Sequence, residues 1–285
     1  MIKLDILMTI LELLMTTFIQ LLLLVGVIII VGFLLGWIQH KSRMYVTGLF
    51  GEKGFLLTAW IGTPIHELGH VLMCILFRHR IVSVQWFPTH TKNGYLGYVQ
   101  HAYNPESLYQ RIGKFFIGIA PMLIGVAALI GLMYGLVPHS YEVFITSVQA
   151  NVQGEQLDRI FFESLFVSIV ALIKSLFTWS NFLSPAFWLF LFLSTCISTH
   201  IALSTEDMRG AFSGLVTMFV ALFCVNAGAE LFQVDVANIT SRLGTYNAYL
   251  VSFSSVALMF ASMTLTLSFL GYQIKRKYSN KDLFI

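Results

Sequence analysis

The sequence is poor in charged residues, which excludes most classes of soluble protein. Only 11% of its 285 residues are Asp, Glu, Lys or Arg, whereas a soluble domain carries about 25%. Hydrophobic residues make up 57%, including 25 Phe. The formal net charge of +3 is too small to indicate a nucleic-acid partner, and no basic, aromatic-rich patch occurs. The composition therefore predicts a chain embedded in a lipid bilayer.

Cysteine is also scarce, and its three copies are dispersed. Cys74, Cys196 and Cys224 each lie alone in an apolar run. An odd, scattered set forms neither a disulfide framework nor a Cys-x-x-Cys metal site. We interpret all three as small core residues, with a ligand role for Cys74 as the weaker alternative.

Internal repeats and low-complexity segments are missing, and no convincing signal-peptide cleavage site follows the first apolar run. That run is too long for a signal-peptide core, so we expect it to be a retained span. Runs of about 20 apolar residues, the length that a span needs, recur along the chain. Six spans are predicted, at residues 13–36, 55–77, 112–136, 185–203, 208–231 and 248–272.

A seventh segment, 160–179, is interrupted by Glu163 and Lys174. It is a span, an interfacial helix or a re-entrant helix. If it does not cross, both termini are cytoplasmic and more Lys and Arg lie on that side, so the positive-inside rule favours six spans over seven. With no transit or retention signal, a bacterial plasma membrane is the default expectation.

We therefore predict an all-α polytopic membrane protein that forms a single domain over 1–285. Its core is expected at 55–231, with accessory spans at 1–54 and 232–285. The polar segments 39–53 and 137–159 are expected to be connections and loops.

One segment outside the spans has the pattern of strands. Residues 81–87 and 95–100 are short, β-branched and aromatic, and turn residues at 88–94 separate them. This pattern predicts a β-hairpin. A hairpin over 80–103 could hold a peptide as an added strand, or it could simply pack at the membrane surface.

The second predicted span carries the motif His66-Glu67-Leu68-Gly69-His70. On a helix, His66 and His70 lie one turn apart on the same face, so both imidazoles can reach one Zn²⁺. Glu67 is placed to act as general base toward a water molecule on the metal. Ionisable residues at membrane depth usually mark function, although buried, hydrogen-bonded side chains are the alternative interpretation. Because Pro64 fits the first position of a helix, the motif is expected to open a half-helix beginning near Thr63.

A catalytic zinc site needs a third protein ligand, which this motif does not supply. A third His at the extended-motif spacing and a downstream Glu-x-x-x-His are both missing. The remaining polar cluster, 200–210, contains Asp207 as the favoured ligand, with Glu206 or His200 as alternatives. Ser204 to Asp207 also matches a helix cap, and the two roles can coexist. His200 could instead donate a hydrogen bond to a developing oxyanion, or be a satisfied core histidine.

The His-Glu-x-x-His motif within a span, the hairpin after it, and an Asp in a later span followed by Gly210 together resemble the site-2 protease family. These are intramembrane zinc metalloproteases, and the resemblance covers about 55–231. It implies that His66, His70 and Asp207 are the zinc ligands and that Glu67 is the catalytic base. It further implies hydrolysis of peptide bonds in membrane-associated or transmembrane substrates, as in regulated intramembrane proteolysis.

Two other functions compete with this interpretation. A metal-binding membrane transporter would need no Glu between the two histidines, and it would often show internal repeats. A proteolytically inactive membrane scaffold of the same fold would not require an intact Glu67. We therefore expect a zinc metalloendopeptidase.

Overall fold

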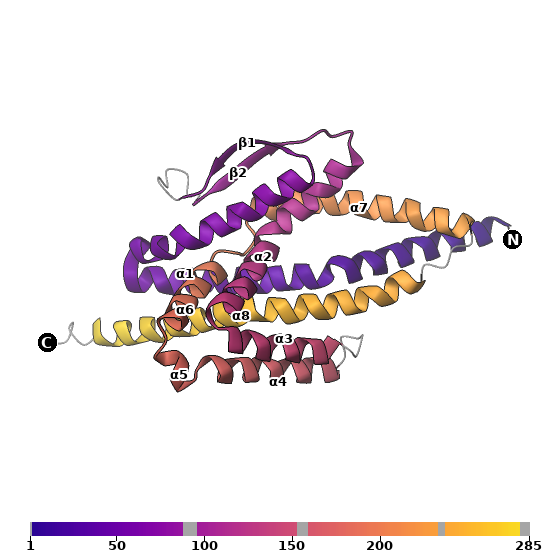
Figure 1. Ribbon diagram of the computed structural model, residues 1–285. Coiled ribbons are helices and arrows are strands. Elements are labelled where there is room, and N and C mark those ends of the chain that lie inside the picture. Colours follow the sequence, from indigo (N-terminus) through magenta and orange to yellow (C-terminus); the bar gives the residue numbers. More distant parts are fainter. Residues whose placement is uncertain (1, 88–95, 153–158, 233–236, 280–285) are drawn as a thin grey trace.

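The computed structural model describes residues 2–87, 96–152, 159–232 and 237–279. Long helices make up most of it, and a two-stranded sheet lies against one side of them (Figure 1). The elements follow one another as α1 (Ile2–Leu76), β1 (Arg80–Gln85), β2 (Tyr98–Ala102), α2 (Leu108–Leu136), α3 (Pro138–Val152), α4 (Arg159–Leu176), α5 (Trp179–Phe182), α6 (Pro185–Ser198), α7 (Thr205–Leu231) and α8 (Ala237–Ser279). The predicted helical architecture with a small hairpin is therefore confirmed.

Four helices of the described residues are long and apolar enough to cross a membrane. They are Leu7–Leu76 of α1, Leu108–Leu136, Thr205–Leu231 and Thr245–Tyr278 of α8. These helices coincide with five of the six predicted spans. The remaining one, 185–203, contains α6, which has 14 residues where a crossing needs about 20. A membrane protein is thus supported, and the number of crossings stays a prediction.

Helix α1 consists of two arms that meet at Gly51, where the chain reverses direction (Figure 1). Gly51 has φ 70° and ψ −175°, a conformation that glycine adopts readily and other residues rarely do. The last carbonyls of the first arm lack helical partners there. Lys275 of α8 is the donor for two of these carbonyls. Its Nζ donates to the carbonyl of Gly48 at 2.9 Å and to that of Leu49 at 3.0 Å.

The connection predicted at 39–53 contains the reversal at Gly51, and the segment is helical on both sides of it. Its residues are held in the helix by packing against α8. The Tyr45 ring lies 5.3 Å from that of Phe269 and 5.6 Å from that of Tyr272.

The loop predicted at 137–159 is also wrong, because α3 occupies most of it. Phe144, Val148 and Val152 recur every four residues and are all buried. Such a stripe is the mark of an amphipathic helix, and the polar composition of the segment concealed it.

The half-helix predicted to begin near Thr63 does not form, because α1 continues through Pro64. Gly62 serves a packing role instead of breaking the helix. A Cβ atom there would lie 2.4 Å from the Cys196 carbonyl oxygen and 2.6 Å from His200 Cβ. The motif is therefore carried by a continuous helix that packs against the end of α6.

Strands β1 and β2 pair antiparallel, which confirms the hairpin. Val84 pairs with Val99 and Ile81 with His101, and the register is irregular between Ile81 and Ser83. The predicted turn, 88–94, lies outside the described residues.

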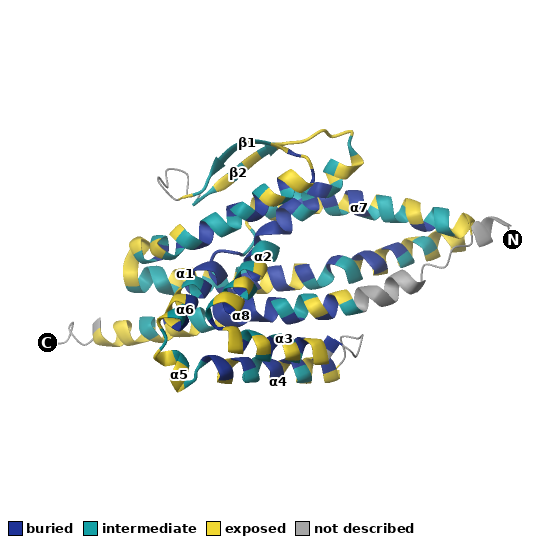
Figure 2. Cartoon of the chain, in the orientation of Figure 1, coloured by how far each residue is buried: buried dark blue, intermediate teal, exposed yellow. Residues whose placement is uncertain are grey.

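Helix α2 lies in backbone contact with both α1 and α7. A Cβ atom on Gly69 of α1 would approach the α2 backbone to 2.9 Å. A Cβ atom on Gly118 would lie 2.5 Å from the Asp207 carbonyl oxygen, and one on Gly214 would lie 2.2 Å from the Phe115 nitrogen. Buried residues gather in this interior, where the long helices face one another (Figure 2).

Gly214→Ala tests this packing. The added methyl group meets the backbone of Phe115, so α7 must move away from α2, and such overpacking typically costs about 1–3 kcal/mol. We expect a melting temperature several degrees lower in detergent. Gly228→Ala on the same helix is the matched control, because nothing lies within 4 Å of its Cβ position. Equal melting of the two variants would contradict the close contact.

Candidate metal centre

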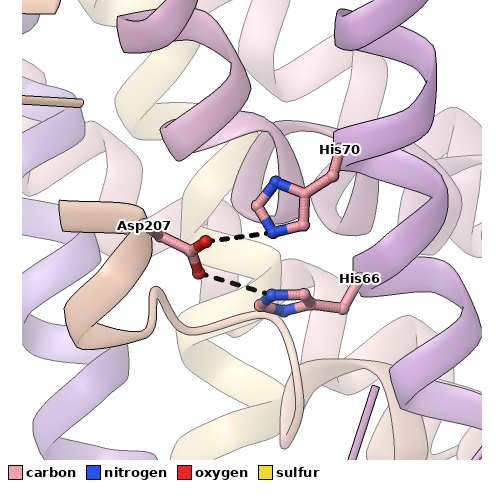
Figure 3. A group of neighbouring side chains, drawn as sticks. All are labelled: His66, His70 and Asp207. Carbon is pink, nitrogen blue, oxygen red and sulfur yellow. Dashed lines mark ion pairs between the residues drawn. The ribbon is translucent and has the colours of Figure 1, made fainter. Parts of the chain in front are cut away.

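His66, His70 and Asp207 point toward one another from α1 and the first turn of α7 (Figure 3). His70 Nε2 lies 3.1 Å from Asp207 Oδ1, and His66 Nε2 lies 3.5 Å from Asp207 Oδ2. One candidate ligand atom of each residue lies within 4.8 Å of the other two. The structure thus brings together the three residues that the sequence suggested as metal ligands. We call His66, His70 and Asp207 the metal-facing group.

A backbone carbonyl holds each histidine ring at Nδ1. His66 Nδ1 donates to the His200 carbonyl at 2.8 Å, and His70 Nδ1 donates to the Ile117 carbonyl at 2.9 Å. Because a carbonyl oxygen can only accept, both Nδ1 atoms carry a proton. In a neutral ring with its proton on Nδ1, the Nε2 lone pair faces Asp207. Metal-binding histidines are commonly oriented by such a hydrogen bond on the other ring nitrogen.

The Ile117 carbonyl is available because Pro121 follows four residues later in α2. In a regular helix, this carbonyl would accept a hydrogen bond from the N–H of residue 121, which proline lacks. The ring of His70 takes that place. The carbonyl of His200 lies in the turn after α6 and is likewise outside a helical ladder.

This donor set fits a divalent cation. Lone pairs on two Nε2 atoms that face a carboxylate at 3.1 and 3.5 Å repel it unless protons or a shared cation lie between them. One cation satisfies all three donors together. Two imidazole nitrogens and one carboxylate oxygen are a ligand set found in catalytic zinc sites and in non-haem iron sites. The group could therefore hold a metal ion.

Asp207 is also part of a helix cap. Its Oδ2 accepts from the Ser204 N–H at 2.8 Å, and its own N–H donates to Ser204 Oγ at 3.1 Å. This reciprocal pair is a capping box, so the cap interpretation is confirmed alongside the metal-facing position. The cap fixes the direction in which the carboxylate points.

Glu67 lies in a cleft of about 870 Å³ that reaches from the metal-facing residues to β2. The residue is only 4% exposed. A Cβ atom on Gly97, just before β2, would lie 2.8 Å from Glu67 Oε1 and 2.7 Å from Thr63 Cγ2. The glycine therefore leaves room for the carboxylate, which lies beside both the metal-facing group and the strand.

The other candidate ligands lie outside the group of three that the described residues form. The ring of His200 is hydrogen-bonded through Nε2 to Thr58 Oγ1 at 3.0 Å, and only its backbone supports His66. Glu206 lines the cleft, and Cys74 is fully buried. A role for His200 at an oxyanion stays a prediction.

Several supporting residues were missed at the level of sequence. They are Gly97 and Gly118, which fit close contacts, and Ile117 with Pro121, which provide a carbonyl. Only the proline within an apolar span offered a signal, because it predicts a carbonyl without a helical partner.

A second pair of histidines joins the hairpin to α2. The two Nδ1 atoms of His79 and His101 are 3.0 Å apart, and His79 Nε2 donates to the Gln110 carbonyl at 2.8 Å. His79 Nδ1 is therefore the acceptor, and His101 Nδ1 is the donor. Burial lowers the pKa of His79, and burial together with the nearby His79 lowers the pKa of His101 to about 4. Both rings are neutral at pH 7.

The structure is that of a helical protein with helices long and apolar enough to cross a membrane, and with a largely buried group of two His and one Asp. Comparison with protein-family models, curated proteins and solved structures found no match to the chain.

Removal of Asp207 tests the metal-facing group. We expect Asp207→Ala to lose most bound metal because one of three donors disappears. Glu206→Gln and His200→Ala should keep it, since their side chains lie outside the group. Zinc and iron content of the purified proteins, measured by mass spectrometry, decides the matter. Full occupancy in Asp207→Ala would show that the third ligand is another residue.

The histidine pair predicts a pH dependence of stability. His101 titrates near pH 6.5 when unfolded and near 4 when folded, so the unfolded chain binds more protons between these values. The free energy of unfolding should therefore fall as the pH falls from 6.5 toward 4. His101→Gln should weaken this dependence, as measured by melting at pH 7.5 and 5. His139→Gln, at an exposed position of α3, should melt like the parent protein, and an unchanged slope in His101→Gln would refute the assignment.

Proposed function

We propose that this chain is a membrane-embedded zinc metalloendopeptidase of the site-2 protease type. The observation that carries the proposal is a buried carboxylate, Glu67, beside two histidines and an aspartate at one cleft. A transporter has no need for a general base next to its metal ligands, and a scaffold has no need for a cleft that leads to them.

His66, His70 and Asp207 would hold the zinc. The chemistry that zinc supplies when bound is to lower the pKa of a coordinated water toward about 7 and to polarise the scissile carbonyl. Glu67 accepts a proton from the attacking water and delivers it to the leaving amine nitrogen. The water oxygen bonds to the carbonyl carbon while the C–N bond breaks, which leaves a carboxyl group and an amine.

Strand β2 provides a place for an extended substrate. Residues 97–101 line the cleft, and β2 pairs with β1 along one edge only among the described residues. A peptide can add to such an edge through backbone hydrogen bonds. A transmembrane substrate must unwind first, because a helix uses its peptide carbonyls internally. The proposed substrates are therefore membrane proteins or peptides with a locally unwound segment.

Glu67→Gln separates catalysis from metal binding. The amide cannot take up the proton of the water, so we expect cleavage to fall by about 10²-fold or more. Metal content should stay unchanged, because Glu67 lies outside the ligand group. Both are measured on purified protein with a labelled transmembrane peptide.

Glu163→Gln is the control, since this exposed residue of α4 pairs only with Arg159 among the described ion pairs. It should cleave like the parent protein. Full cleavage by metal-loaded Glu67→Gln would sink the hydrolase proposal.

A further inference from the structure

The cleft beside the metal-facing group carries opposite charges along its walls. Glu67, Glu206 and Asp207 lie around the metal-facing end. Lys114 of α2 is the one lysine or arginine among the described residues that line it. This asymmetry favours one orientation of a charged ligand.

Lys114 lies close to the reacting end of the cleft. Ile117, whose carbonyl holds His70, follows it by three residues, and Gly118, which contacts the Asp207 backbone, follows by four. Residues three and four apart share a helix face and lie about 5–6 Å apart. Ser213, which binds the ammonium group, follows Asp207 by six residues on α7, which is about 9 Å along the helix axis at 1.5 Å per residue. An extended peptide covers about 9 Å in about three residues, at roughly 3.3 Å for each.

Neutral oxygens hold the Lys114 side chain in place. Its Nζ donates to Ser213 Oγ at 2.7 Å and to Tyr103 Oη at 3.3 Å, and it lies 4.9 Å from the centre of the Tyr103 ring. None of the ion pairs among the described residues includes Lys114. The charge is therefore oriented without being neutralised.

These contacts leave hydrogen-bond donors for an anion. An ammonium group only donates, so both hydroxyl oxygens act as acceptors toward Lys114. Their own hydrogens, and the third N–H of the ammonium, then have no acceptor among the described hydrogen bonds. A positive charge with such donors around it matches a carboxylate, and hydrogen bonds to charged groups are the stronger class.

We propose that Lys114 is a specificity-determining residue that binds a carboxylate of the substrate about one to three residues from the scissile bond. The inference rests on the proposed peptidase function for the identity of the ligand. An Asp or Glu side chain and a free C-terminus offer the same chemistry, and the test below separates them.

Binding is measured without cleavage, in metal-loaded Glu67→Gln protein in neutral detergent, by fluorescence anisotropy of labelled extended peptides. One set of peptides carries Glu or Gln at each of three positions on either side of a central bond. A second set ends in a free carboxylate or an amide. We expect roughly tenfold or tighter binding for at least one carboxylate peptide over its neutral partner. The set that discriminates identifies the source of the carboxylate.

Lys114→Met should abolish this discrimination, and Lys114→Arg should keep it. Arg111→Met, at an exposed position one turn earlier on α2 and outside the cleft, is the matched control and should discriminate like the parent. Tyr103→Phe keeps the ammonium but removes one hydroxyl, so it should weaken the preference even if Lys114→Met fails to fold.

Equal binding of every carboxylate and neutral pair would overturn the proposal, and so would discrimination that survives in Lys114→Met. Failure of all the peptides to bind a fully metal-loaded protein would overturn it as well. Because no step of the assay requires cleavage, a failed peptidase proposal and a failed role for Lys114 give different results.

Discussion

The site depends on α2 lying in backbone contact with two helices at once. Gly69 brings the motif-bearing arm of α1 against it, and Gly118 brings it against the first turn of α7. Without this contact, the histidines and Asp207 would belong to separate parts of a bundle. The same helix supplies the Ile117 carbonyl that orients His70, because Pro121 removes the N–H that would otherwise occupy it. One helix therefore contacts both parts of the group of three and orients one of its histidines.

Burial explains why so few atoms at the site remain without partners. In an apolar environment, each unsatisfied polar group is costly, so such groups are normally paired. Both Nδ1 atoms are satisfied by carbonyls, and Asp207 by its cap. The atoms left facing one another are the two Nε2 atoms and the carboxylate, which are those a metal would bind. The structural hydrogen bonds of the two histidines use Nδ1 and leave Nε2 for the proposed chemistry. In Asp207, Oδ2 takes the cap hydrogen bond, and Oδ1 faces His70.

The sequence predicted the parts of the site that follow from local geometry. His66, Glu67 and His70 share one helical turn, and the lack of a further histidine ligand pointed to a carboxylate in the polar segment around Asp207. Contributions of α2 were missed, because Pro121 indicates a carbonyl without a helical partner but not which ring binds it, and a close fit at Gly118 depends on which helix lies opposite. Composition misled at α3, where a buried stripe runs through a polar segment. At 39–53 the composition predicted a connection but did not indicate that packing on α8 keeps it helical. Gly62 and Pro64 have the pattern of a helix start, but α1 continues through both residues. Gly62 allows close packing against the end of α6 instead.

The claim that this metal-facing group hydrolyses peptide bonds is tested most directly with isotopically labelled water. The purified chain, loaded with zinc, is incubated with unwound transmembrane peptides in water enriched in ¹⁸O, and products are analysed by mass spectrometry. Hydrolysis predicts new C-termini that have gained ¹⁸O from the solvent, that disappear when the metal is chelated and that return when zinc is restored. A protein that binds one equivalent of metal at His66, His70 and Asp207 yet generates no such termini would contradict a hydrolytic centre.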